Sequence, residues 1–291
     1  MGLGPCTILG VAYPVCSTTA NTNQRRVFNT INPAAAAFIG ALDENTDIGY
    51  QNYKGVKLSA VRRAGSGLTV NGTYTLGVCR GTPTATTFNQ ASGGYLKPND
   101  PSFDEGYCDQ DYRHIAQATL GYETPEVGTR AVRTIVSHWR ASGILSAHSG
   151  DRLNITTGRD IAFTGIGVTG NNQQRPNQVN TDYYKKTLAT WFNAAAFAQP
   201  DPGTLGNLKR NAVVGPGFWN VDLALSRLIP LGSTRRMELR LESFNLLNHF
   251  NWGTPVTNFN VGTFGRITTM AGPNNGRDAP RIMQFGIKYD F

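Results

Sequence analysis

The sequence has 291 residues and a formal net charge of +8, with 33 glycines, 15 prolines and only 16% charged side chains. Aromatic residues make up 10% of it and apolar residues 40%, which excludes a disordered chain, and the composition is not that of a coiled coil. The basic residues occur singly or in pairs rather than as a stripe, which argues against a nucleic-acid partner. No apolar run is long enough to form a membrane-spanning helix.

Seven segments alternate apolar and polar residues with a period of two, which predicts strands with two different faces. In chain order they span residues 50–63, 68–78, 111–123, 131–147, 219–225, 237–243 and 283–291. Several are longer than the five or six residues typical of globular strands, and they suit tilted strands that cross a membrane.

The connections between these segments alternate between short and long. The short ones contain Gly or Pro and span residues 63–67, 124–130 and 230–234. The long ones are rich in Gly, Asn, Pro and Thr and span residues 80–110, 158–217 and 248–279. Outer-membrane barrels have short periplasmic turns and long external loops, whereas a half-buried soluble sheet gives the same period but no such alternation.

We therefore predict an all-β fold, an antiparallel up-and-down meander of about seven or eight strands that forms part of a transmembrane barrel with long external loops. Residues 50–291 would form the C-terminal barrel portion, and residues 1–49 an irregular external segment. An eighth strand near residues 7–13 would permit a small closed barrel, but Pro5 and Pro14 argue against it.

Charged residues mark the polar faces of two late strands. Glu238, Arg240 and Glu242 share one face, and Asp222 lies on the polar face of the preceding strand. A dry core would penalise such stacked charges, whereas a wet lumen solvates them. We expect all four side chains to face the lumen.

Aromatic residues lie near the ends of several predicted strands. Trp139, Trp219, Tyr289 and Phe291 are candidates for the aromatic girdles at the membrane surfaces, or they belong to ordinary core packing. Others lie in the predicted external loops, where rings can stack on sugars or flat chelates; they are Tyr95, Tyr107, Tyr183, Tyr184, Trp191 and Trp252.

The four cysteines form no CxxC pair, so a zinc site is not expected. Two local pairs, Cys6 with Cys16 and Cys79 with Cys108, are disulfide candidates in an oxidising compartment, the alternative being four reduced thiols. Because the second pair flanks one external loop, we expect a disulfide or at least proximity there.

Recognisable catalytic, cofactor and metal motifs are lacking, so no enzyme is expected. The glycine string at residues 165–170 is not followed by a helix start, so it does not fit a phosphate loop. Five acidic residues in and beside the first long loop lack calcium-loop spacing and favour a solvated loop; they are Asp100, Asp104, Glu105, Asp109 and Asp111.

Several motifs are similar to the late barrel of Oar-like TonB-dependent receptors. They are residues 240–255, 264–267 and 283–291, with 191–193, 196–197, 206–211 and 215–217 upstream and 21–26, 32–33, 53–55 and 62–63 earlier still. Together they cover almost the whole chain in order. The C-terminal strand ending at Phe291 also resembles the signature that the barrel-assembly machinery reads from the periplasm.

The resemblance implies a bacterial outer-membrane transport receptor with an N-terminal plug and a barrel of about 22 strands. The chain would be its C-terminal part, embedded in outer-membrane lipid, and TonB would act only through N-terminal parts not recognised in this sequence. The ligand would be an unidentified small molecule or oligosaccharide. The alternative function is a soluble β-rich carbohydrate-binding or adhesive module, which requires Leu68, Leu239 and Phe285 inside a packed core.

Overall fold

A computed structural model describes residues 2–40, 47–65, 67–82, 95–97, 99–126, 128–165, 174–232, 235–271 and 280–291. Its main element is an antiparallel sheet whose seven long strands follow the order β14-β13-β12-β7-β6-β4-β3, with the short β5 (Gly106–Tyr107) paired to β4. The long strands are β3 (Gln51–Arg63), β4 (Leu68–Gly81), β6 (His114–Glu123), β7 (Trp139–His148), β12 (Phe218–Pro230), β13 (Arg236–Phe244) and β14 (Ile282–Asp290). Each pairs with its neighbours in the chain, which confirms the predicted all-β meander.

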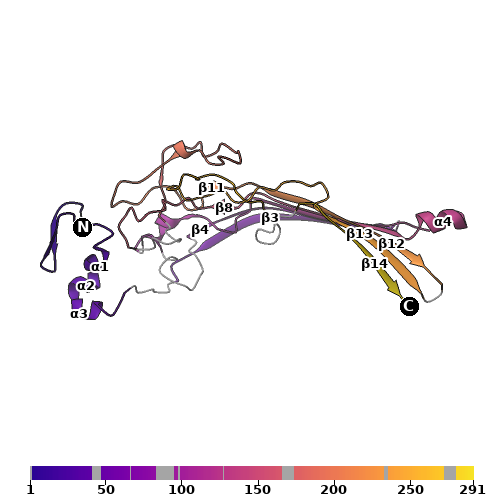
Figure 1. Ribbon diagram of the computed structural model, residues 1–291, viewed down its shortest axis with the longest axis horizontal. Coiled ribbons are helices and arrows are strands. Elements are labelled where there is room, and N and C mark those ends of the chain that lie inside the picture. Colours follow the sequence, from indigo (N-terminus) through magenta and orange to yellow (C-terminus); the bar gives the residue numbers. More distant parts are fainter. Residues whose placement is uncertain are drawn as a thin grey trace.

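The sheet is open within the described residues, because the outer strands β3 and β14 each pair on one side only. Short connections, at residues 64–67, 124–138 and 231–235, join strands at the end that carries helix α4 (Arg130–Val136) and the C-terminus. The long connections and the N-terminal segment lie toward the opposite end (Figure 1). Parts of the predicted connections, residues 66, 83–94, 98, 127, 166–173, 233–234 and 272–279, lie outside the described residues.

Two predicted strand starts are wrong. Helix α4 occupies the first part of the segment predicted as a strand from residue 131, and β7 begins only at Trp139. Val132, Ile135 and Val136 have the i, i+3, i+4 spacing of one helix side, which competes with the strand pattern. Strand β6 begins at His114 rather than residue 111 because the Asp111 carboxylate is held in the loop, where it accepts hydrogen bonds from the Cys79 amide and the Arg152 guanidinium.

The register of the sheet sorts the strand residues into two faces, because directly paired residues of an antiparallel sheet point to the same side. We name them the apolar face and the polar face. The apolar face includes Val56, Leu58, Val70, Tyr74, Leu120, Tyr122, Trp139, Leu145, Trp219, Leu223, Leu225, Leu239, Leu241, Phe285, Ile287 and Tyr289. The polar face includes Lys57, Ser59, Asn71, Thr73, Gln117, Thr119, Arg140, Ser142, Asn220, Asp222, Ser226, Glu238, Arg240, Glu242, Gln284 and Lys288.

The hydrophobic core of the described chain lies in the long loops rather than against the sheet. Its buried members come from the second and third long connections; they are Ile155, Trp191, Phe192, Ala196, Phe197, Leu208, Val213 and Ile267. Four two-residue strands, β8 (Arg152–Leu153), β9 (Asn177–Gln178), β10 (Phe197–Ala198) and β11 (Val213–Val214), pair as β11 with β8 and β10 with β9 and brace this core, and the 3-10 helix η2 (Ala194–Ala196) adjoins β10. We call the assembly of the long connections the loop domain.

The N-terminal segment forms its own small unit beside the loop domain. Strands β1 (Cys6–Ile8) and β2 (Val11–Tyr13) form a hairpin that is not part of the large sheet, so the proposed eighth strand near residues 7–13 does not extend the barrel. The helices α1 (Thr22–Arg25), α2 (Val27–Ile31) and α3 (Pro33–Ala36) follow. The Arg25 guanidinium donates to the Phe163 carbonyl at 2.7 Å and fastens this unit to the second long connection.

Candidate functional site

The polar face of β13 and β14 carries a chain of charges. Arg240 Nη2 lies 2.6 Å from Glu242 Oε1, and Gln284 Nε2 donates to Glu242 Oε2 at 2.5 Å. The register places Glu238 on the same face, directly opposite Lys288. All three predicted lumenal charges of β13 therefore lie on one side of the sheet, where Arg240 pairs with Glu242 and Gln284 donates to Glu242.

Asp222 lies on the same face, at the external half of β12, but its carboxylate is engaged. It accepts hydrogen bonds from Asn220 Nδ2 at 2.7 Å and from the Asn245 amide at 2.9 Å. Asn245 has φ 50°, a left-handed conformation that asparagine tolerates, so the chain can turn sharply after β13. Asp222 thus holds the start of the third long connection against β12.

The residues that follow β13 also connect this turn to Trp219 on the apolar face. Asn251 accepts from the Trp219 amide at 3.0 Å and donates to its carbonyl at 2.9 Å, and the His249 ring stacks on the Trp219 indole with centroids 4.0 Å apart. Asn245 Oδ1 accepts from the His249 amide at 2.9 Å. The residues of the 240–255 motif therefore make a defined corner at the external end of the sheet.

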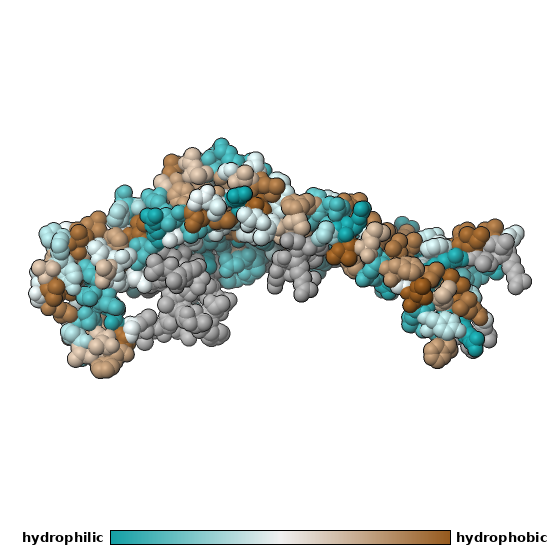
Figure 2. Space-filling model, viewed as in Figure 1, coloured by the Kyte–Doolittle hydropathy of each residue, from teal (hydrophilic) through white to brown (hydrophobic). Residues whose placement is uncertain are grey.

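Many side chains of the apolar face are exposed, and none of its strand residues named above is fully buried. Phe285 is 66% exposed, Ile287 63%, Tyr74 39% and Leu223 36%, and apolar side chains lie at the surface of the part of the sheet that carries β12–β14 (Figure 2). The acidic residues of the long strands all lie on the other face; they are Glu123, Asp222, Glu238, Glu242 and Asp290. A soluble module with Phe285 in a packed core does not fit this arrangement, whereas a surface that meets hydrocarbon does.

The predicted girdle residues lie at the two ends of the apolar face. Trp219 and Trp139 are separated in the register by eight residues of β12, about 26 Å along the strand at about 3.3 Å per residue. A tilt of about 40° reduces this to roughly 20 Å, close to the apolar band of about 25 Å in outer-membrane barrels. Tyr289 and Phe291 lie at the end shared with Trp139, with ring centroids 6.3 Å apart.

Sequence reasoning missed a second aromatic pair at the external end. The Tyr74 hydroxyl and His114 Nδ1 are 2.7 Å apart on the apolar face, and the register places Tyr74 in the same row as Trp219. The sequence does place Tyr74 on the apolar side of residues 68–78. Its alignment with Trp219, however, depends on the register of the strands between them. The assignment of Tyr74, Trp139, Trp219, Tyr289 and Phe291 to aromatic girdles remains a prediction.

Disulfides join Cys6 to Cys16 and Cys79 to Cys108. The second links the external end of β4 to the first long connection across a separation of 29 residues. Such bonds form in oxidising compartments, which include the bacterial periplasm.

Two acidic residues of the first long connection are buried in ion pairs, so the predicted solvated loop is wrong for them. Asp104, in the 3-10 helix η1 (Pro101–Asp104), lies 2.6 Å from Arg175 Nη1, with side chains 3% and 1% exposed. Asp111 lies 2.8 Å from Arg152 Nε, and Arg152 packs over the Tyr107 ring at 3.4 Å. Burial lowers the pKa of Arg175, and the Asp104 carboxylate opposes that shift. Among the residues that the structure describes, no group of three or more His, Cys, Asp or Glu side chains is placed to hold a metal.

Most of the loop aromatics proposed for ligand stacking instead build the loop domain. Trp191 is 9% exposed and its indole N–H donates to the Val214 carbonyl at 2.9 Å. Trp252 packs edge-on against Trp191, and Tyr183 stacks on Phe197. Burial raises the pKa of Tyr184, whose hydroxyl accepts from the Val214 amide at 2.9 Å. Of the glycine string at 165–170, only Gly165 lies within the described residues.

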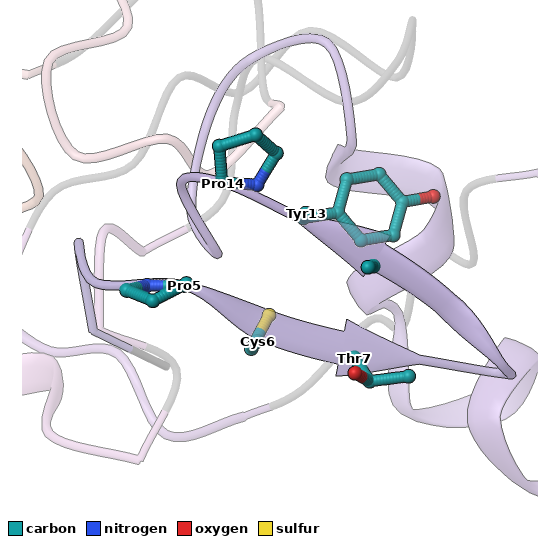
Figure 3. Close-up of a pocket in the computed structure, with 6 residues that line it drawn as sticks. Pro5, Cys6, Thr7, Tyr13 and Pro14 are labelled. Carbon is teal, nitrogen blue, oxygen red and sulfur yellow. The ribbon is translucent and has the colours of Figure 1, made fainter.

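A shallow depression on the N-terminal hairpin is lined by Pro5, Cys6, Thr7, Ala12, Tyr13 and Pro14 (Figure 3). Its lining combines one disulfide-bonded cysteine with proline, alanine, threonine and tyrosine side chains. Since no charged group lines it, the depression does not define the chemistry of a ligand.

The family described as the outer membrane beta barrel domain matches residues 7–284 of the sequence. The chain belongs to this outer-membrane barrel family. Its location is therefore the bacterial outer membrane, and the end of the sheet with short turns faces the periplasm. In barrels of this kind an apolar band faces the lipid and the interior is polar. We therefore expect the apolar face to meet lipid, the polar face with its predicted lumenal residues to line the interior, and the loop domain to stand on the external side. No match is found among the curated proteins.

Proposed function

We propose that the chain is the C-terminal part of the barrel of a TonB-dependent receptor, which takes up a small molecule or oligosaccharide across the outer membrane and carries out no catalysis. The observation that carries this proposal is the open sheet with two outer strands that run in the same direction. The strands alternate in direction along the meander, so β3 and β14, its first and seventh long strands, both run from the external side to the periplasm.

This parity restricts how the barrel can close. Pairing β14 directly with β3 would be parallel, and so would each junction between two copies of the sheet. An all-antiparallel barrel therefore needs an odd number of further strands between β14 and β3. A receptor barrel of about 22 strands would add about fifteen, which satisfies the requirement. The β1–β2 hairpin adds an even number of strands and forms a separate sheet.

The two sides of the sheet support transport rather than a structural role alone. The polar face offers a charged, hydrated wall for a lumen, and the loop domain stands where a ligand would first arrive from outside. The apolar face supports outer-membrane lipid as a partner. The apolar side chains of β14, which ends next to Phe291, support the proposed contact with the barrel-assembly machinery.

Extraction of the native protein from outer membranes in mild detergent provides the test. We expect the complete polypeptide to be retained by the immobilised periplasmic domain of TonB, and imaging of the particles to show a barrel with more strands than β3–β14. Failure of the intact protein to bind TonB would overturn the transport mechanism. A closed barrel built from residues 51–291 alone would overturn the assignment as part of a larger receptor.

A further inference from the structure

Arg227 is a cation on the lipid-facing side of the sheet. The register places it directly opposite Trp139 on one side and Leu239 on the other. Its guanidinium carbon lies 5.3 Å from the centroid of the Trp139 ring. A charged side chain on this face is costly in hydrocarbon, but it is stable where the lipid headgroups begin.

The position of Arg227 along β12 matches that border. Arg227 lies in the same row as Trp139, at the periplasmic end of the apolar face. Arg62 of β3 is also a cation on this face, but the register places it in the row of Leu223 rather than that of Arg227. The acidic residues of the long strands all lie on the polar face. The charge that Arg227 places on the apolar face is therefore not balanced by a strand carboxylate on that face, and it complements lipid phosphates.

Helix α4 continues the lipid-facing surface beyond the strands. The Trp139 indole N–H donates to the Ile135 carbonyl at 2.9 Å, which fixes the C-terminal end of the helix beside the apolar face. Val132, Ile135 and Val136 share one side of the helix and are 45%, 67% and 43% exposed. Arg133 turns to Glu126, with 3.4 Å between Nη1 and Oε2. An apolar helix side in this position suits the boundary between headgroups and acyl chains.

We propose that Arg227, Trp139 and α4 form a binding site for the headgroup of an anionic phospholipid in the periplasmic leaflet. Nε of Arg227 is buried, so the two parallel hydrogen bonds to the phosphate oxygens would come from its Nη1 and Nη2 groups, a geometry that arginine offers and lysine does not. The Trp139 indole lies beside the glycerol region, and the exposed apolar side of α4 covers the upper part of the acyl chains. Two features favour a phospholipid as the ligand. The positive charge of Arg227 complements a phosphate, and the apolar side of α4 is continuous with the lipid-facing apolar face.

Spin-labelled lipids test the headgroup contact on the full protein purified from outer membranes and reconstituted in nanodiscs. We expect the wild-type protein to immobilise labelled phosphatidylglycerol in preference to labelled phosphatidylcholine. Arg227→Gln should lower that preference about fivefold, the effect of about 1 kcal/mol per basic residue near an anionic surface. Arg227→Lys should keep part of the preference.

Arg140→Gln is the matched control, because Arg140 neighbours Trp139 in β7 but lies on the polar face, opposite Ser226. It should change the preference less than twofold. Retarded gel migration before heating establishes that each variant is folded. Equal immobilisation of the two lipids by the wild-type protein, or equal losses in Arg227→Gln and Arg140→Gln, would overturn the proposal.

A fluorescent label tests the helix independently. Ile135→Cys labelled with an environment-sensitive dye should show blue-shifted emission in phosphatidylglycerol-containing vesicles, whereas labelled Arg133→Cys should emit as in water. The native cysteines lie in disulfides and do not take the label. Emission typical of water at both positions would contradict the placement of α4 in the lipid boundary.

Discussion

The buried pair of Asp104 and Arg175 joins the first long connection to the second. Arg175 donates from Nε to the Leu208 carbonyl at 2.7 Å and from Nη2 to the Phe103 carbonyl at 3.1 Å, while Asp104 Oδ2 accepts from the Leu96 amide at 2.7 Å. Asp104→Ala would leave a desolvated guanidinium without its counter-charge. Removal of one partner of such a pair destabilises by about 3–5 kcal/mol, so the open state of the loop domain should become roughly 150-fold to 5,000-fold more populated.

Cleavage by a protease added to intact cells measures that population. Where closing is faster than cleavage, the initial rate follows the fraction of open molecules, so Asp104→Ala should be cut at least 100-fold faster. Asp109→Ala is the matched control, because Asp109 lies in the same connection and is 58% exposed, 3.8 Å from Arg210. Its effect should be below about tenfold.

A double variant separates the charge imbalance from loss of packing. Asp104→Ala with Arg175→Met removes both charges and should be cut more slowly than Asp104→Ala alone, since the uncompensated guanidinium is gone. If Asp104→Ala and Asp109→Ala accelerate cleavage equally, or if Arg175→Met adds fully to the first defect, the reasoning about the buried pair is refuted.

Three further predictions concern pH, packing and covalent links. Burial and the neighbouring Asp151 raise the pKa of Tyr112 to about 12. The stability that Tyr112 contributes to the loop domain is therefore present below pH 10 and is lost as the pH rises through about 12; Tyr112→Phe should remove that part of the alkaline rise in protease cleavage, and an unchanged profile would contradict it. A Cβ atom at Gly77 would lie 2.6 Å from the Tyr53 hydroxyl, so Gly77→Val should lower the free energy of unfolding, measured in urea, by about 1–3 kcal/mol, but by less in a Tyr53→Ala background; equal losses in both backgrounds would show that Tyr53 is not the obstacle. Replacing Cys79 and Cys108 with serine opens a link across 29 residues, which should destabilise the first long connection by roughly 3–4 kcal/mol and accelerate its cleavage; an unchanged cleavage rate would argue against that stabilisation.

The strands of the sheet could be predicted because each carries its own signal. Residues 237–243 alternate so regularly that the apolar and polar sides are visible without a partner strand, and β13 spans Arg236–Phe244. The structure adds the register, that is, which residues of neighbouring strands lie opposite one another. Helix α4, in which Val132, Ile135 and Val136 share one side, was missed because seven residues are too few to separate the helix period from the strand period.

The loop domain could not be predicted, because its contacts have no local pattern. Phe192 is fully buried, yet one of its ring contacts is Phe264, from another connection, with centroids 5.7 Å apart. Arg175 and Asp104 are 71 residues apart in the chain. Composition indicated long Gly- and Asn-rich loops, but burial of these side chains depends on how the loops fold together. For this reason the sequence alone predicted solvent exposure for Asp104 and Trp191, and only the structure shows that they are buried.

If the sheet spans the outer membrane as part of a barrel, successive side chains of one strand meet hydrocarbon and water in turn. Single spin labels at residues 221–226 of β12, in the protein reconstituted in bilayers, test it through collision rates with oxygen and with a water-soluble nickel complex. We predict high oxygen accessibility at Val221, Leu223 and Leu225 and high nickel accessibility at Asp222, Ala224 and Ser226. Uniform accessibility along the six positions, or protection of both faces from both reagents, would contradict it.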